Sequence, residues 1–220
     1  MNNADTELKA AEDTSFGASL GIYRYFLISF LVIAIDQIVK LAVHYNMEYG
    51  AAGEIKVFGD WFKLYYIRNP GMAFGMELGH AYGKLMLSVF RLFAMFGIAY
   101  YLRVLALRPS TNKGFLVCLG MILGGAVGNL VDSIFYGVWL DIPAPNASTP
   151  WFHGQVVDMF YFDLWQGLLP EWIPVFGGEY YSFWPIFNVA DAAIFMGVAI
   201  VLSLQGRFFP NPEETETAKN

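Results

Sequence analysis

Apolar residues run along this chain in four long stretches, which polar or aromatic segments separate. A helix that crosses a bilayer needs about 20 mostly apolar residues. The stretches that reach this length are 23–43, 84–105, 115–136 and 184–204. We therefore expect an α-helical integral membrane protein with four transmembrane helices within residues 23–205. The two ends are polar, so 1–22 and 206–220 are expected to be disordered tails.

Basic residues indicate how the four expected helices are oriented. The short connection 103–114 holds three Lys or Arg residues, whereas 137–183 holds none. Because cytoplasmic loops carry an excess of Lys and Arg, we expect both termini in the cytoplasm. Segments 46–83 and 137–183 then face outward, and all six tryptophans lie in or beside them. That placement is typical of an aromatic belt at a membrane interface.

The two outward segments differ in their patterns. Apolar and polar residues alternate over 57–67, which predicts a small β-containing cradle on the membrane surface. Segment 137–183 is rich in Pro, Gly and aromatic residues, so we expect an enlarged folded loop or a short amphipathic helix there.

Composition excludes several function classes. A net charge of −6 with 13 basic residues offers no basic patch for nucleic acid. One cysteine and three scattered histidines exclude a disulfide framework and a metal site built from Cys or His. No metal and no cofactor are therefore expected.

Ionisable and amide side chains lie inside the apolar stretches, where they are costly and indicate function. Asp36 and Lys40 are four residues apart, so they share a helix face and can form an ion pair. With the expected orientation, further polar residues reach the same level near the outer face: Asn129, Asp132, Asp158, Asn188 and Asp191. Each one alone also fits a snorkelling charge or a hydrogen bond between helices. Their common depth favours a shared site.

Two neighbouring carboxyl groups favour one kind of chemistry. Close carboxylates do not both ionise easily, so the pair shares a proton. The ionised group can then take a proton from water while the other donates one, as in an aspartic endopeptidase. The alternative is a non-enzymatic four-helix carrier or scaffold. A carrier should place ionisable groups through the membrane depth, yet the inner halves of these stretches are almost purely apolar. A scaffold would not explain the converging aspartates.

Five short segments resemble, in the same order, those of the bacterial lipoprotein signal peptidases (signal peptidase II). They are 36–40 (DQIVK), 68–75 (RNPGMAFG), 124–132 (GGAVGNLVD), 156–158 (VVD) and 187–191 (FNVAD). The resemblance implies an enzyme of the bacterial inner membrane that cleaves lipid-modified prolipoproteins just before the lipidated cysteine. The site would lie near the periplasmic face, in contact with membrane lipid, and we expect a monomer.

The same resemblance assigns roles to residues. It implies that Asp158 and Asp191 are the catalytic pair. The supporting or substrate-binding residues would be Asp36, Lys40, Asn69, Gly71, Asn129, Asp132 and Asn188. Within that set, we expect Asn69 and Asn129 to hold the substrate backbone.

Two departures from the family pattern stand out. The family usually has Arg after the position of Asp132, and this chain has Ser133, so a counter-charge is missing locally. Arg91 is a possible replacement, although snorkelling to lipid headgroups is the favoured interpretation. The insertions 137–157 and 162–184 are also longer than usual, and we expect them to form an enlarged outer subdomain.

Overall fold

The computed structural model describes residues 3–70, 83–173, 177–178, 180–182 and 184–209. Contacts divide the chain into two compact units. The first comprises Met1–Ala34, Arg91–Gly128 and Ala190–Asn220, and the second comprises Ile35–Phe90 and Asn129–Val189.

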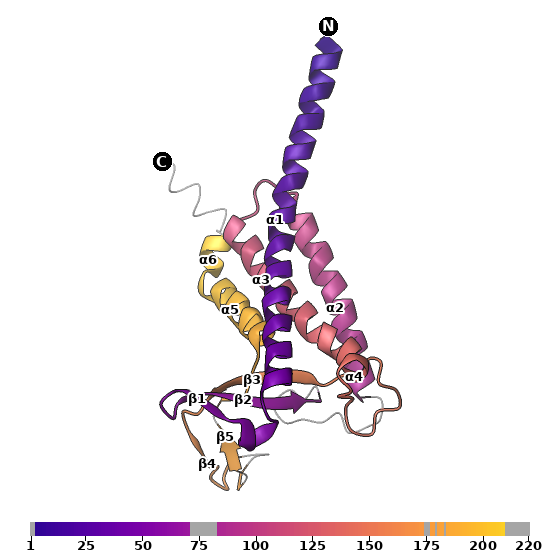
Figure 1. The fold of residues 1–220 in the computed structure, drawn as a ribbon. Coiled ribbons are helices and arrows are strands. Elements are labelled where there is room, and N and C mark those ends of the chain that lie inside the picture. Colours follow the sequence, from indigo (N-terminus) through magenta and orange to yellow (C-terminus); the bar gives the residue numbers. More distant parts are fainter. Residues whose placement is uncertain (1–2, 71–82, 174–176, 179, 183, 210–220) are drawn as a thin grey trace. The chain divides into compact units, whose positions relative to one another are not determined.

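The long helices follow the apolar stretches of the sequence. They are α1 (Asn3–Asn46), α2 (Gly83–Ala106), α3 (Lys113–Val131) and α5 (Val189–Ser203), and the short α6 (Gln205–Phe208) follows α5 (Figure 1). Within the described residues, three helical segments are long and apolar enough to cross a membrane, namely Gly21–Asn46, Gly83–Ala106 and Lys113–Trp139. The first three expected spans are therefore present as helices.

Two helix boundaries differ from the expectation. α1 already begins at Asn3, over polar residues expected to be disordered, and this part of the chain is rich in the strong helix formers Ala, Glu and Leu. α5 begins at Val189 rather than at 184 and has 15 residues. At 1.5 Å per residue it is about 22 Å long, shorter than a hydrocarbon core of about 30 Å. It starts late because Phe187 pairs with a strand instead.

The first unit is a helical body with an apolar core. Its buried residues come from α1, α2 and α3: Tyr25, Leu102, Leu105, Phe115, Leu116, Leu119 and Leu123. α3 approaches α1 closely at two glycines. A Cβ added to Gly120 would lie 2.8 Å from the carbonyl oxygen of Tyr25, and one added to Gly124 would lie 2.7 Å from Cβ of Val32. The Ser29 hydroxyl donates to the Gly120 carbonyl at 2.8 Å across this contact. Small residues permit such a close approach.

The second unit is built on a three-stranded antiparallel sheet, in the order β1 (Ile55–Phe58), β2 (Phe62–Asn69) and β3 (Val156–Phe162) (Figure 1). β1 and β2 confirm the β element expected from the alternation at 57–67. β3 lies in a segment expected to be a loop or an amphipathic helix. The strand is buried over most of its length, so its sequence VVDMFYF lacks the apolar–polar alternation that marks a half-exposed strand. A separate pair, β4 (Gln166–Leu168) and β5 (Tyr180–Ser182), forms within the second insertion.

An irregular helical end connects α3 to this sheet. After Val131 the chain makes a π-helix, η2 (Asp132–Tyr136), and then the short α4 (Gly137–Trp139). The first insertion folds back onto this turn, because Gly154 N–H donates to Ser133 O at 2.9 Å and Phe152 N–H to Ile134 O at 3.2 Å. β3 follows directly. The core here joins Val43, Tyr66, Tyr136, Ile142, Val157 and Met159.

Candidate active site

A buried ion cluster joins the end of α1 to the π-helix. Lys40 Nζ lies 2.8 Å from Asp36 Oδ2, as the spacing of four residues predicted, and 2.7 Å from Asp132 Oδ2. All three side chains have no exposed surface. Lys40 therefore provides the counter-charge for Asp132, which sequence alone had left without one.

Ser133, where the resemblance led us to expect Arg, is engaged in a different way. Its hydroxyl donates to the Asn129 carbonyl at 2.9 Å. Lys84 Nζ at the start of α2 lies 3.5 Å from the Ser133 oxygen. The serine thus joins the backbone of α3 to a second cation, while Asp132 is paired elsewhere.

Two further side chains complete the ion cluster, and sequence reasoning missed both. The Gln37 amide donates to Asp132 Oδ1 at 2.9 Å and to Asp36 Oδ2 at 3.2 Å. The Tyr136 hydroxyl donates to Gln37 Oε1 at 2.9 Å. Gln37 lies inside the DQIVK segment, so its position beside Asp36 was the available signal. Tyr136 offered none, because its placement depends on the π-helix.

Amide side chains connect this cluster to Asp158. Asn129 Oδ1 accepts from Lys40 Nζ at 3.0 Å and from Asn188 Nδ2 at 3.1 Å. Asn188 Nδ2 also donates to Asp158 Oδ1 at 2.6 Å, and Asn69 Nδ2 donates to Asp158 Oδ2 at 3.2 Å. Both oxygens of the Asp158 carboxylate thus accept hydrogen bonds from amide side chains. The carboxylate is 1% exposed.

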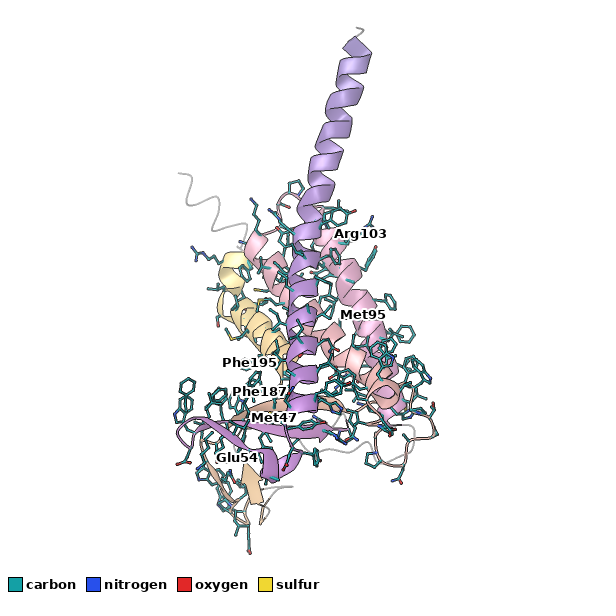
Figure 2. All side chains as sticks on the ribbon, viewed as in Figure 1. Met47, Glu54, Met95, Arg103, Phe187 and Phe195 are labelled. Atoms are coloured by element: carbon teal, nitrogen blue, oxygen red, sulfur yellow. The ribbon has the colours of Figure 1, made fainter. Side chains whose placement is uncertain are left out.

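The sheet register explains how these amides reach the aspartate. Antiparallel pairing of β2 with β3 places Asn69 opposite Val156 and Ile67 opposite Asp158. Phe187, which is labelled in Figure 2, exchanges backbone hydrogen bonds with Phe160, at 2.8 Å and 3.0 Å. This pairing brings the next residue, Asn188, alongside β3.

Six of the sequence-predicted residues therefore lie in one hydrogen-bonded network with Asp158. They are Asp36, Lys40, Asn69, Asn129, Asp132 and Asn188. Asp191 lies in the first turn of α5, which belongs to the first unit, and is half-buried. Its pairing with Asp158 stays a prediction. Gly71 lies outside the described residues.

The network defines what this site can do chemically. Asp158 is a buried carboxylate, and an amide N–H donates to each of its two oxygens. Such a group can act as an acid or base towards a polar substrate. Among the described residues no group of three or more His, Cys, Asp or Glu side chains could hold a metal ion.

Known proteins resemble this chain over most of its length. A profile of the family described as "Signal peptidase (SPase) II" matches residues 28–205. The lipoprotein signal peptidase of Amoebophilus asiaticus is 45% identical over 82% of this chain and 77% of its own length. That of Porphyromonas gingivalis is 41% identical over 78% of this chain and 78% of its own length. A third, from Chlorobium phaeobacteroides, is 32% identical over 84% of this chain and 97% of its own.

A solved structure resembles the fold as well. It is a bacterial membrane enzyme determined by the in meso method, with a TM-score of 0.54 and 21% identity over 86% of this chain and 92% of its own. At that identity the likeness shows the fold alone. The matched profile covers most of the chain, and the relatives match it over 77% to 97% of their own length, so the chain belongs to the signal peptidase II family.

Proposed function

We propose that this membrane protease removes the signal peptide from diacylglyceryl-modified prolipoproteins, cleaving just before the lipidated cysteine, with Asp158 and Asp191 as the catalytic pair. Family membership supports the cleavage of prolipoproteins. The observation that carries the residue assignment is the Asp158 carboxylate, which is buried and held by amide donors on both oxygens.

Chain connectivity supports the choice of Asp191 as the second member of the pair. Asn188 donates to Asp158 at 2.6 Å, and Asp191 follows it by three residues. Three residues of chain span at most about 11 Å. The aspartate is therefore tethered within reach of a site that Asn188 already contacts.

In the proposed reaction, the ionised aspartate of the pair takes a proton from water, whose oxygen attacks the carbonyl carbon before the lipidated cysteine. The protonated aspartate donates its proton to the carbonyl oxygen. When the tetrahedral intermediate collapses, the C–N bond breaks, the leaving amine takes the proton that the first aspartate received from water, and a hydroxyl of the intermediate returns a proton to the second aspartate. Asn69 and Asn129 belong to the same network as Asp158, which supports their assignment to holding the substrate backbone.

The proposal includes a location and a topology. Both termini lie in the cytoplasm, α5 with α6 crosses the bacterial inner membrane as a fourth span, and the site lies near the periplasmic face. The enzyme acts as a monomer in contact with membrane lipid. The absence of Lys and Arg from 137–183 supports this orientation.

The test is a cleavage assay in detergent or liposomes with a diacylglyceryl-modified prolipoprotein, read by the mass shift of the product. Asp158→Asn and Asp191→Asn should each abolish cleavage with folding intact, whereas Asp60→Asn in the exposed β1–β2 turn should not. Cleavage that survives either catalytic substitution would refute the assignment. Binding without cleavage by the unchanged protein would favour a carrier or scaffold.

A further inference from the structure

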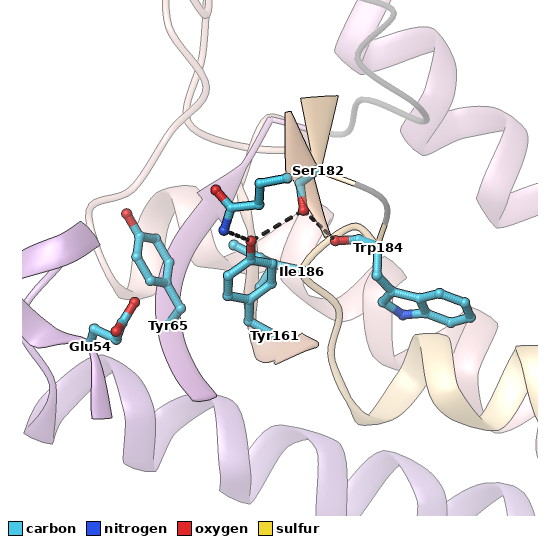
Figure 3. A pocket seen from close by; sticks show the side chains of 7 residues that line it. Glu54, Tyr65, Tyr161, Ser182, Trp184 and Ile186 are labelled. Carbon is cyan, nitrogen blue, oxygen red and sulfur yellow. Dashed lines mark hydrogen bonds between the residues drawn. The ribbon is translucent and has the colours of Figure 1, made fainter. Parts of the chain in front are cut away.

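A pocket of about 370 Å³ opens between the three-stranded sheet and the second insertion (Figure 3). The sheet contributes Tyr65 from β2 and Tyr161 from β3, and Glu54 precedes β1. The other wall comes from the segment expected to be an insertion relative to the family. Its lining residues are Gln166, Ser182 and Trp184, and Ile186 just after the insertion completes the wall.

Hydrogen bonds fix the inner wall of this pocket. The Tyr161 hydroxyl lies 3.2 Å from Ser182 Oγ and accepts from the Gln166 amide, as the dashed lines in Figure 3 show. Ser182 Oγ donates to the Trp184 carbonyl at 3.2 Å. The rings of Tyr65 and Tyr161 meet edge to face with their centroids 6.1 Å apart. Two aromatic rings in contact and a chain of hydrogen bonds therefore form this wall of the pocket.

The charges beside the pocket sum to a negative value. Lys63 Nζ lies 2.8 Å from Asp163 Oδ2 and 3.4 Å from Glu54 Oε1, so two carboxylates share one ammonium. The hydrogen bond from Lys63 holds the pKa of Asp163 below its usual range, which keeps this carboxylate charged. The same ammonium lies 5.9 Å from the centroid of the Tyr161 ring. Two of the residues that contact Lys63, Glu54 and Tyr161, also line the pocket, so its wall offers a carboxylate and an aromatic face to a second cation.

Strand alternation separates this pocket from the candidate active site. Asp158 and Tyr161 are three residues apart on β3, so their side chains leave opposite faces of the sheet. Phe160 and Phe162 share the face of Asp158 and stack with Phe62 and Phe187 in an apolar layer. Such a layer suits lipid, whereas the pocket on the opposite face combines aromatic rings with the polar side chains of Glu54, Gln166 and Ser182. A peptide is therefore a better occupant of the pocket than a lipid headgroup.

We propose that this pocket binds the ammonium or guanidinium group of a Lys or Arg side chain in the part of the substrate that follows the lipidated cysteine. The inference rests on the proposed function and adds a specificity element to it. Along β3 the pocket is about 10 Å from Asp158 at 3.3 Å per residue. Because the two lie on opposite faces, the substrate chain must also pass round the edge of the sheet, and we allow about 10–25 Å for its path from Asp158 to the pocket. In an extended chain this length places the cation roughly three to eight residues after the cleaved bond.

The experiment uses pairs of diacylglyceryl lipopeptides that carry either Lys or the uncharged norleucine, moved in turn through these positions. For the unchanged protein, KM should be about three- to tenfold lower for the best-placed Lys peptide than for its norleucine partner, with equal kcat. Glu54→Gln should abolish this preference and leave KM for the norleucine peptide unchanged. Glu48→Gln, an equal charge change at an exposed residue outside the lining, should retain it.

A second pair of variants tests the aromatic wall. Tyr65→Phe keeps the ring and should keep the preference for Lys, whereas Tyr65→Leu should lose it. A Lys preference absent at every position, or one that Glu54→Gln leaves intact, would overturn the proposal. The proposal would also be overturned if the change in KM caused by Glu54→Gln required phosphatidylethanolamine in the bilayer and did not depend on the peptide. The bound cation would then be a lipid headgroup.

Direct binding separates failure of this inference from failure of the proposed function. Affinity of the same peptide pairs is measured for Asp158→Asn in nanodiscs made of phosphatidylglycerol alone. If the unchanged protein cleaves no lipopeptide, the proposed function fails, and the binding ratio of Lys to norleucine still decides the pocket. A ratio near one would overturn the pocket proposal even where cleavage is normal.

Discussion

Lys40 should be the residue whose loss most destabilises the second unit. Its ammonium lies between Asp36 at 2.8 Å and Asp132 at 2.7 Å, and none of the three side chains has exposed surface. Lys40→Met would remove the shared cation from two buried carboxylates. Removing one partner of a buried ion pair costs about 3–5 kcal/mol, because a charge is left uncompensated in a medium that solvates it poorly.

The assay can follow each unit with its own probe. All six tryptophans belong to the second unit, so their fluorescence reports its unfolding. The single cysteine, Cys118, is 3% exposed in the first unit, so its reaction with a thiol dye reports the other. We expect Lys40→Met to lower the free energy of unfolding by about 3–5 kcal/mol in the tryptophan signal. Lys56→Met, which removes an exposed ion pair with Asp60, should leave it unchanged.

A double substitution tests the electrostatic reason. Lys40→Met with Asp132→Asn removes one positive and one negative charge, so the net charge of the cluster returns to that of the unchanged protein. The double variant should therefore be more stable than the sum of the single effects predicts, by about 0.5–3 kcal/mol. Strictly additive effects, or a Lys40→Met variant within about 0.5 kcal/mol of the unchanged protein, would refute the reasoning.

Three further predictions follow from other contacts. Asn188→Ala removes a 2.6 Å hydrogen bond to the carboxylate on β3, worth about 1.5–3 kcal/mol, so kcat for lipopeptide cleavage should fall about ten- to hundredfold. An unchanged kcat would contradict this. Gly154→Ala places a Cβ against the Asp132 carbonyl oxygen, and the forced shift should destabilise the second unit by about 1–3 kcal/mol in the tryptophan assay. A stability equal to that of the unchanged protein would show that the backbone yields there. Finally, the hydrogen bond from Lys63 holds the pKa of Asp163 below its usual range. The stability from this pair is therefore present above the unfolded pKa of about 3.9 and is lost as the pH falls through the lower folded value. Unfolding measured from pH 5 downward should show this loss, and Asp163→Asn should reduce it.

Local spacing predicted part of the site, and tertiary structure decided the rest. Asp36 and Lys40 were predictable as a pair because helix geometry alone brings residues four apart together. The second partner of Lys40 was not, since Asp132 begins a π-helix that no residue pattern announced. The same irregular turn places Tyr136 against Gln37. Sequence therefore indicated several of the residues that join this network but not how they pair.

The strand that carries Asp158 shows a second limit. Two faces of β3 are buried, so its residues do not alternate, and the segment resembled an aromatic loop. Its pairing with β2 and with Phe187 is long-range, and neither register can be read from spacing. The motif order placed Asp158 correctly among the polar residues, but its contacts depend on these registers.

Donor chemistry explains why a costly buried ion cluster would be retained beside the candidate site. An ammonium has three N–H donors and no acceptor, and those of Lys40 face Asp36, Asp132 and Asn129. The amide oxygen of Asn129, rather than its nitrogen, must therefore face Lys40. That oxygen also accepts from Asn188 Nδ2, which in turn donates to Asp158. The charge on Lys40 thus fixes the orientation of two amides in sequence, and the second of them holds the carboxylate of Asp158 in place.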